Sequence, residues 1–173
     1  MFSKRPILNT VLLLIILLAP GSNALCQAEN SPLVVFLVRH AEKQRPGSDP
    51  SLTEAGKARA EALANVLRDS QISAVHSTNY KRTRATALPF ANQISKKVQI
   101  YNPRDHRSLI KKIKAAGGRH LVVGHSNTVP ALVAEFGGES GRPIAEPTEF
   151  DRLYILTFDE TGDVTTVLLR IGD

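Results

Sequence analysis

The stretch SPLVVFLVRHAEKQRP, residues 31–46, joins an apolar run directly to a cation and an imidazole. Residues 33–38 are apolar without alternation, which is typical of a strand covered on both faces in a parallel sheet. Arg39 and His40 follow at once. Charged side chains are rarely buried without a partner, so the end of this strand is a candidate functional site.

The rest of the chain alternates between helical and strand patterns. Helices are predicted at 52–70, 79–94, 104–118 and 127–138, and further strands at 71–77, 96–103 and 119–126, with two final strands between 151 and 171. This alternation predicts an α/β fold, a three-layer α/β/α sandwich with a mostly parallel central sheet. At 173 residues, the chain has room for one such domain, which we place at residues 32–173.

Residues 1–24 have the pattern of a secretory signal peptide. Lys4 and Arg5 precede a short apolar core at 11–19, and small residues lead up to Ala24. We therefore expect cleavage after Ala24 and export, to the periplasm. An uncleaved signal anchor is the alternative. Cys26 also suggests lipidation, but the bulky Leu25 before it argues against this, and a lone cysteine cannot form an internal disulfide.

The charge and the aromatic content argue against nucleic acid as a partner. The formal charge of +6 falls to +4 once Lys4 and Arg5 leave with the signal, and the chain has no Trp. The basic residues are dispersed, and little aromatic surface is available for base stacking. A small anionic ligand suits this composition better, and the oligomeric state stays open.

Polar residues stand at the carboxyl ends of three predicted strands. They are Arg39-His40, Ser77-Thr78 and Gly124-His125-Ser126. In parallel sheets such ends meet at one crevice, where ligands bind. Carboxylates are scarce at these positions, so neither a metal site nor a cofactor is expected. Imidazole beside guanidinium favours phosphoryl transfer, because arginine binds phosphate oxygens in pairs and a neutral imidazole can attack phosphorus.

Four segments in order resemble the histidine phosphatase (phosphoglycerate mutase-like) superfamily. LVRHAEK at 37–43 is similar to its Arg-His-Gly motif, and LTEAGKARAEAL at 52–63 to its Leu-Thr/Ser-x-x-Gly helix. VHSTNYKRTRATALPFA at 75–91 resembles its second motif, and HLVVGHSNTVPALV at 120–133 its strand that ends in a second histidine. The departures are Ala41 for glycine, Asn79 for proline and Ala85 for Gln or Glu.

The resemblance implies a role for each matching residue. His40 would be the nucleophile that becomes phosphohistidine, while Arg39 and Arg82 would clamp the phosphate. His125 would contact the phosphoryl oxygens, and the backbone amides of Ser126 and Asn127 would face the anion. Gly124 would allow a tight turn before them. These cations and donors would stabilise the charge of the transition state.

The proton donor to the leaving group is the open position. In the mutase-like branch the acid follows the third strand, where this chain has Asp105. Glu42 is the rival, and Asp105 would serve equally well as the N-cap of the third helix. We expect His76 to be structural, His106 and His120 to lie at the surface, and Glu146 and Glu149 to decorate a loop.

The sequence thus predicts a metal-independent phosphomonoesterase acting on a small phosphorylated metabolite or an envelope sugar phosphate. Residues 44–51 and 137–149 are the only sizeable lid material, and a small lid favours hydrolysis over a mutase reaction. Three alternatives stay open: a non-catalytic phosphate or phosphoglycan-binding module, a phosphohistidine or protein phosphatase, and a mutase.

Overall fold

The computed structural model describes residues 32–146 and 148–172; the predicted signal peptide lies outside them. Within these ranges, strands and helices alternate along the chain as the patterns predict. The elements are β1 (Val34–Arg39), α1 (Glu54–Val66), β2 (Ala74–Thr78), α2 (Lys81–Gln93), β3 (Val98–Tyr101), α3 (His106–Ala116), β4 (Arg119–Gly124), α4 (Thr128–Glu135), β5 (Arg152–Phe158) and β6 (Val164–Arg170).

One six-stranded sheet forms the middle layer, in the order β3-β2-β4-β1-β5-β6. The pairs β2–β3, β2–β4 and β1–β4 are parallel. Strand β5 joins β1 antiparallel and continues into β6 as a hairpin. The predicted α/β fold with a mostly parallel sheet is therefore confirmed.

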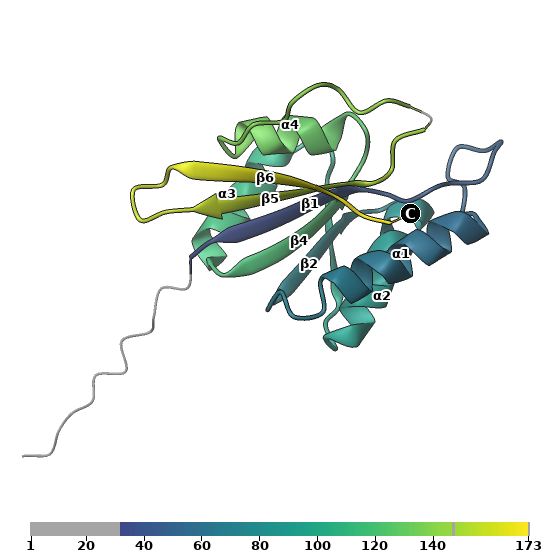
Figure 1. Cartoon of the computed structure of the whole chain (residues 1–173), viewed down its shortest axis with the longest axis horizontal. Coiled ribbons are helices and arrows are strands. Elements are labelled where there is room, and N and C mark those ends of the chain that lie inside the picture. The colour runs from purple at the N-terminus through teal and green to yellow at the C-terminus, as the bar shows by residue number, and fades with distance from the viewer. Residues whose placement is uncertain (1–31, 147, 173) are drawn as a thin grey trace, which may run out of the picture.

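The helices form the two outer layers. Helices α1 and α2 lie on one face of the sheet, and α3 and α4 lie on the other (Figure 1). Alternate residues of β1 point to the two layers, with Phe36 and Val38 in the core under α1 and α2, and Leu37 in the core under α3 and α4. Because both faces are covered, β1 is apolar throughout, which explains the unbroken run in the sequence.

The parallel pairing of β1 with β4 sets the two candidate histidines side by side. Arg39 pairs with Gly124 in register, and the His40 backbone N–H then donates to the Gly124 carbonyl at 2.9 Å. His40 and His125 therefore leave the same end of adjacent strands. The crossover through helices between parallel strands produces this alignment from residues far apart in the chain.

Helix α1 fastens the segment that follows His40. Thr53 is its N-cap, as its hydroxyl accepts from the Gly56 N–H at 3.0 Å, while the Thr53 N–H donates to the Glu42 carbonyl. A Cβ on Gly56 would lie 2.2 Å from that same carbonyl oxygen. Only glycine allows this approach, which explains the glycine of the LTEAG segment.

Within the described residues, no helix is both long and apolar enough to span a membrane.

Candidate active site

His40 is buried at the carboxyl end of β1, with 2% of its surface exposed. Its Nδ1 lies 2.7 Å from the Ala41 carbonyl oxygen. A carbonyl only accepts, so Nδ1 carries the proton and Nε2 keeps its lone pair. Burial lowers the pKa of His40 to about 3. The Ala41 hydrogen bond opposes this shift, and the charges of Arg39 and Arg82 add to it. The ring is therefore neutral at physiological pH.

His125 faces His40 across the site. The two ring centroids lie 5.5 Å apart in an edge-to-face arrangement. One ring nitrogen of His125 lies 3.0 Å from the Thr78 hydroxyl and the other 3.4 Å from the Arg82 guanidinium. Burial, then the charges of Arg82 and Arg39, lowers the pKa of His125 to about 4. Two neutral imidazoles thus lie together, close to the charges of Arg82 and Arg39.

Arg82 enters from the first turn of α2. Its guanidinium lies over the Tyr80 ring, 4.5 Å from the centroid, and 3.7 Å from the Asp49 carboxylate. Its Nε and Nη1 are buried and have no hydrogen-bond partner within the described residues. Unused guanidinium donors beside two imidazoles suit an oxyanion, which arginine can bind through two parallel hydrogen bonds.

Thr86 ties α2 to the His40 segment. Its hydroxyl accepts from the Ala41 N–H at 3.0 Å and donates to the Arg82 carbonyl at 2.8 Å. One buried side chain thus couples the backbone beside the proposed nucleophile to the backbone of the proposed phosphate clamp. This explains the threonine in the ATA part of the second motif.

Arg39 lies behind the two histidines rather than in the wall of the cavity that they share. Its Nη1 donates to the Glu149 carbonyl at 2.8 Å, and its Nη2 pairs with the Glu146 carboxylate at 2.5 Å. The guanidinium also lies 4.0 Å from the centre of the Phe150 ring. Its Nε has no hydrogen-bond partner within the described residues. Arg39, which the sequence predicts to bind phosphate, is thus paired with the Glu146 carboxylate in this structure.

The shared cavity has a volume of about 320 Å³. It contains both histidines, Arg82 and Ser126 of the predicted site. The complete lining is His40, Lys43, Tyr80, Arg82, Pro103, Arg104, His125, Ser126, Asn127, Thr128 and Glu146. Three cations and one carboxylate among these residues make the cavity suited to an anion.

Gly124 differs from its predicted role. It has no positive φ, so it does not make a strained turn. Instead a Cβ there would lie 2.9 Å from the Thr128 hydroxyl oxygen and 3.0 Å from both the Tyr101 hydroxyl and Val129. The glycine lets the start of α4 pack tightly against β4, where the Thr128 hydroxyl accepts from the His125 N–H at 2.9 Å.

Neither predicted proton donor lines this cavity. Asp105 caps α3, accepting from the Ser108 N–H at 3.1 Å, and lines a separate cavity beside His76. Hydrogen bonds from Ser108 lower the pKa of Asp105, which keeps its carboxyl ionised. Glu42 is held by Arg59 at 2.9 Å. The capping interpretation of Asp105 is the one that the geometry supports.

Glu146 is the one carboxylate among the described residues that lines the cavity. The sequence pointed to nothing more than a loop residue here, because its neighbours carry no motif and its position depends on the pairing with Arg39. Lys43 and Tyr80 were also missed, although both lie within segments that resemble family motifs. Their places follow from loop packing, which residue patterns do not encode.

Glu149 is also more than a loop residue. It is 9% exposed, and its carboxylate accepts from Arg142, Arg152, Arg170 and the Ala145 N–H at 2.7 to 3.2 Å. These partners, Arg152 above all, lower the pKa of Glu149 far below its usual range. The network fixes the loop whose carbonyl holds Arg39.

The remaining histidines include one wrong prediction. His120 is 3% exposed instead of lying at the surface. Its Nδ1 is 3.1 Å from Nε2 of buried His76, and its Nε2 is 2.7 Å from the Gly117 carbonyl oxygen. His76 therefore has a structural partner away from the shared cavity, in agreement with expectation. Within residues 32–146 and 148–172, no three His, Cys, Asp or Glu side chains gather as a metal site would require.

A family model, that of the histidine phosphatase superfamily (branch 1), matches residues 35–102. The matched segment includes Arg39, His40 and Arg82, and it ends before His125. It is less than half of the chain. No curated protein matches the sequence.

Solved structures of phosphatases share the fold. The protein histidine phosphatase SixA, in complex with tungstate, has a TM-score of 0.65 at 19% identity, covering 80% of this chain and 97% of SixA. A mycobacterial glucosyl-3-phosphoglycerate phosphatase with inorganic phosphate has a TM-score of 0.63 at 15% identity, covering 79% and 95%. A candidate alpha-ribazole-5'-P phosphatase of Escherichia coli also reaches 0.63 at 15% identity, covering 82% and 100%. At these identities the similarity establishes the fold.

Proposed function

We propose that this chain is a member of the histidine phosphatase superfamily that hydrolyses phosphomonoesters without a metal or cofactor, through a phosphohistidine on His40. The observation that carries the proposal is the neutral His40 ring in one cavity with Arg82, whose buried Nε and Nη1 lack hydrogen-bond partners within the described residues. The proposed nucleophile and the proposed anion clamp thus line the same cavity. The match to the family model over residues 35–102 supports the same reaction class.

In the first step, the Nε2 lone pair of His40 attacks phosphorus and the bond to the leaving oxygen breaks. The negative charge on the equatorial oxygens is stabilised by Arg82, by His125 and by the amides at the start of α4. In the second step, water attacks the phosphohistidine, the P–N bond breaks, and its electron pair returns to Nε2. The Ala41 carbonyl holds the proton on Nδ1 throughout, so that Nε2 stays the reacting atom.

Glu146 is the side chain that we assign to proton transfer, in place of Asp105 and Glu42. Phosphoryl oxygens that bind Arg39 would compete with the Glu146 carboxylate and release it. The freed carboxylate would take up a proton from the monoprotonated phosphoryl group or from solvent, and pass it to the leaving oxygen as the P–O bond breaks. The same carboxyl would then take a proton from the attacking water. This exchange would also bring Arg39 into contact with phosphate, as the family resemblance implies.

Hydrolysis is favoured over phosphoryl transfer to a second substrate because water reaches the cavity. Tyr80, Arg104 and Asn127 line it and are exposed. A mutase has to protect its phosphoenzyme from water. For the substrate, we propose a small phosphorylated metabolite or an envelope sugar phosphate, met after export to the periplasm. A phosphohistidine side chain is the second candidate, since SixA, which shares the fold, is a protein histidine phosphatase.

The test is release of inorganic phosphate from p-nitrophenyl phosphate by the wild type and by His40→Ala, each with and without EDTA. We expect turnover that EDTA leaves unchanged and that the variant loses. His106→Ala is the matched control, since His106 pairs with Glu135 outside the cavity. Phosphate binding without turnover in the wild type would favour the binding module, and exchange of label between two sugar phosphates would favour a mutase.

A further inference from the structure

A second, larger cavity adjoins the catalytic one. Its volume is about 570 Å³, and it shares the three residues Tyr80, Pro103 and Arg104 with the catalytic cavity. Its other lining residues are Asn79, Ile100, Tyr101 and Asn102. The two cavities therefore form one cleft, in which the phosphoryl group would occupy the end at His40 and the leaving group would extend towards β3.

Arg104 is the cationic side chain that lines both parts of this cleft. Its side chain is exposed, so it can reach a ligand in either part of the cleft. Among the described residues, the Arg104 guanidinium forms no ion pair. Its backbone N–H is held by the Asn102 side chain at 3.0 Å, which fixes the turn that carries it.

The floor of the second cavity offers apolar surface beside this cation. Ile100 is 51% exposed and Tyr80 is 37% exposed, and both line this cavity. An exposed apolar surface next to an unpaired guanidinium fits an organic group that ends in an anion. A neutral or cationic leaving group would leave the charge of Arg104 without a partner.

We infer that the preferred substrate is a phosphomonoester whose leaving group carries a second negative charge, bound by Arg104, with its organic part on Ile100 and Tyr80. This inference rests on the proposed function and narrows its substrate class. A single charge-assisted hydrogen bond in such a site changes affinity by about tenfold. We therefore expect about that much discrimination between substrates that differ only in this charge.

The experiment compares 4-phosphonooxybenzoate with 4-phosphonooxybenzamide, which have similar size and differ in one negative charge. We expect the wild type to have a kcat/KM about tenfold higher for the benzoate. Arg104→Gln should remove this preference, and Ile100→Asp should reverse it by placing a carboxylate in the cavity. Lys97→Gln is the control, because this exposed lysine lies at the other end of β3 and should leave the preference unchanged.

Turnover of both compounds with equal kcat/KM in the wild type would overturn the inference and leave the proposed function standing. So would a preference that survives in Arg104→Gln and disappears in Lys43→Gln, because Lys43 lines the catalytic cavity and not the second one. No turnover of these compounds or of p-nitrophenyl phosphate would overturn the proposed function, and the inference with it.

Discussion

The imidazole rings of His40 and His125 lie 5.5 Å apart, edge to face, at the ends of two adjacent parallel strands. Arg82 lies 3.4 Å from the second ring and brings a cation to the same place. With two neutral rings so close to a guanidinium, one ring can attack phosphorus while the other helps to stabilise the negative charge of the phosphoryl oxygens. The hydrogen bond of His40 Nδ1 to the Ala41 carbonyl leaves Nε2 of this ring free to attack, in line with the role that we propose for it.

The first prediction separates the two histidines. His125→Ala should lower kcat for p-nitrophenyl phosphate by about 100-fold, because one donor to the phosphoryl oxygens is lost. The variant should still form the phosphoenzyme, since His40 is intact. The measurement is acid-labile, base-stable phosphorylation, located by mass spectrometry after rapid quenching at high pH. Phosphorylation of His125 in the wild type would contradict the assignment.

The second prediction concerns the charge of the two rings. Their lowered pKa values, about 3 for His40 and about 4 for His125, mean that the neutral forms persist as the pH falls below 6.5. At pH 5.5 both rings should still be neutral, so activity should not fall through protonation of these groups. Histidine ring NMR signals, assigned with His40→Asn and His125→Asn, report this directly. A midpoint near 6.5 for either ring would show that burial does not control its pKa.

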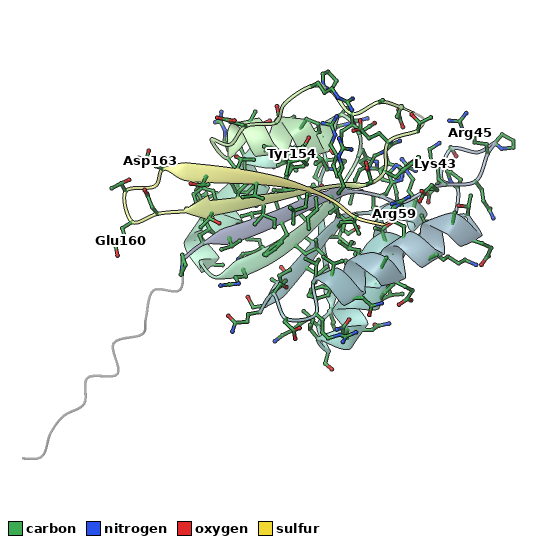
Figure 2. All side chains as sticks on the ribbon, viewed as in Figure 1. Lys43, Arg45, Arg59, Tyr154, Glu160 and Asp163 are labelled. Atoms are coloured by element: carbon green, nitrogen blue, oxygen red, sulfur yellow. The ribbon has the colours of Figure 1, made fainter. Side chains whose placement is uncertain are left out.

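The third prediction tests Glu146 as the proton donor. Glu146→Gln should lower kcat for an alkyl phosphate by about 100-fold. The loss for p-nitrophenyl phosphate should be much smaller, because p-nitrophenolate departs without a proton. Glu160→Gln is the matched control: Glu160 lies in the β5–β6 turn, at the opposite end of the sheet from Lys43 (Figure 2). Equal losses for both substrates would assign Glu146 to structure or binding.

The fourth prediction concerns Glu149, whose carboxylate forms ion pairs with three arginines. Glu149→Gln should lower the free energy of unfolding by about 3 kcal/mol, because buried Arg152 loses its charge partner. Urea unfolding followed by circular dichroism measures the change, with Glu160→Gln again as the control. Since the Glu149 carbonyl holds Arg39, KM should also rise in the folded variant. An unchanged stability would mean that water replaces the carboxylate.

The sequence was sufficient to predict the positions of the site residues that lie at or just after the ends of strands. The apolar runs before Arg39 and Gly124 predict parallel strands, whose carboxyl ends share one edge of the sheet. The structure makes β1 and β4 neighbours, and this brings His40 and His125 together. The position of Arg82 in the site could be predicted because the residue lies in the first turn of α2, shortly after the end of β2. These positions are set by backbone pairing, which apolar patterns report well.

The proton donor could not be predicted in the same way. In the sequence, Asp105 fits the role of a helix cap and that of a catalytic acid equally well. In the structure its carboxylate accepts from the Ser108 N–H, which supports the role of a cap. Glu146 reaches the cavity because Glu149 anchors its loop through arginines from other parts of the chain. Tertiary ion pairs of this kind leave no periodic signal.

The direction of β1 has a practical consequence. The strand starts beside Leu33 and His40 follows its far end, so the two are separated by about 20 Å, the rise of six extended residues. A reporter or affinity handle fused ahead of Leu33 would therefore emerge on the side remote from the mouth of the cleft. Molecules coupled to a bead or sensor chip through that end should present their catalytic openings outward, accessible even to bulky phosphorylated ligands.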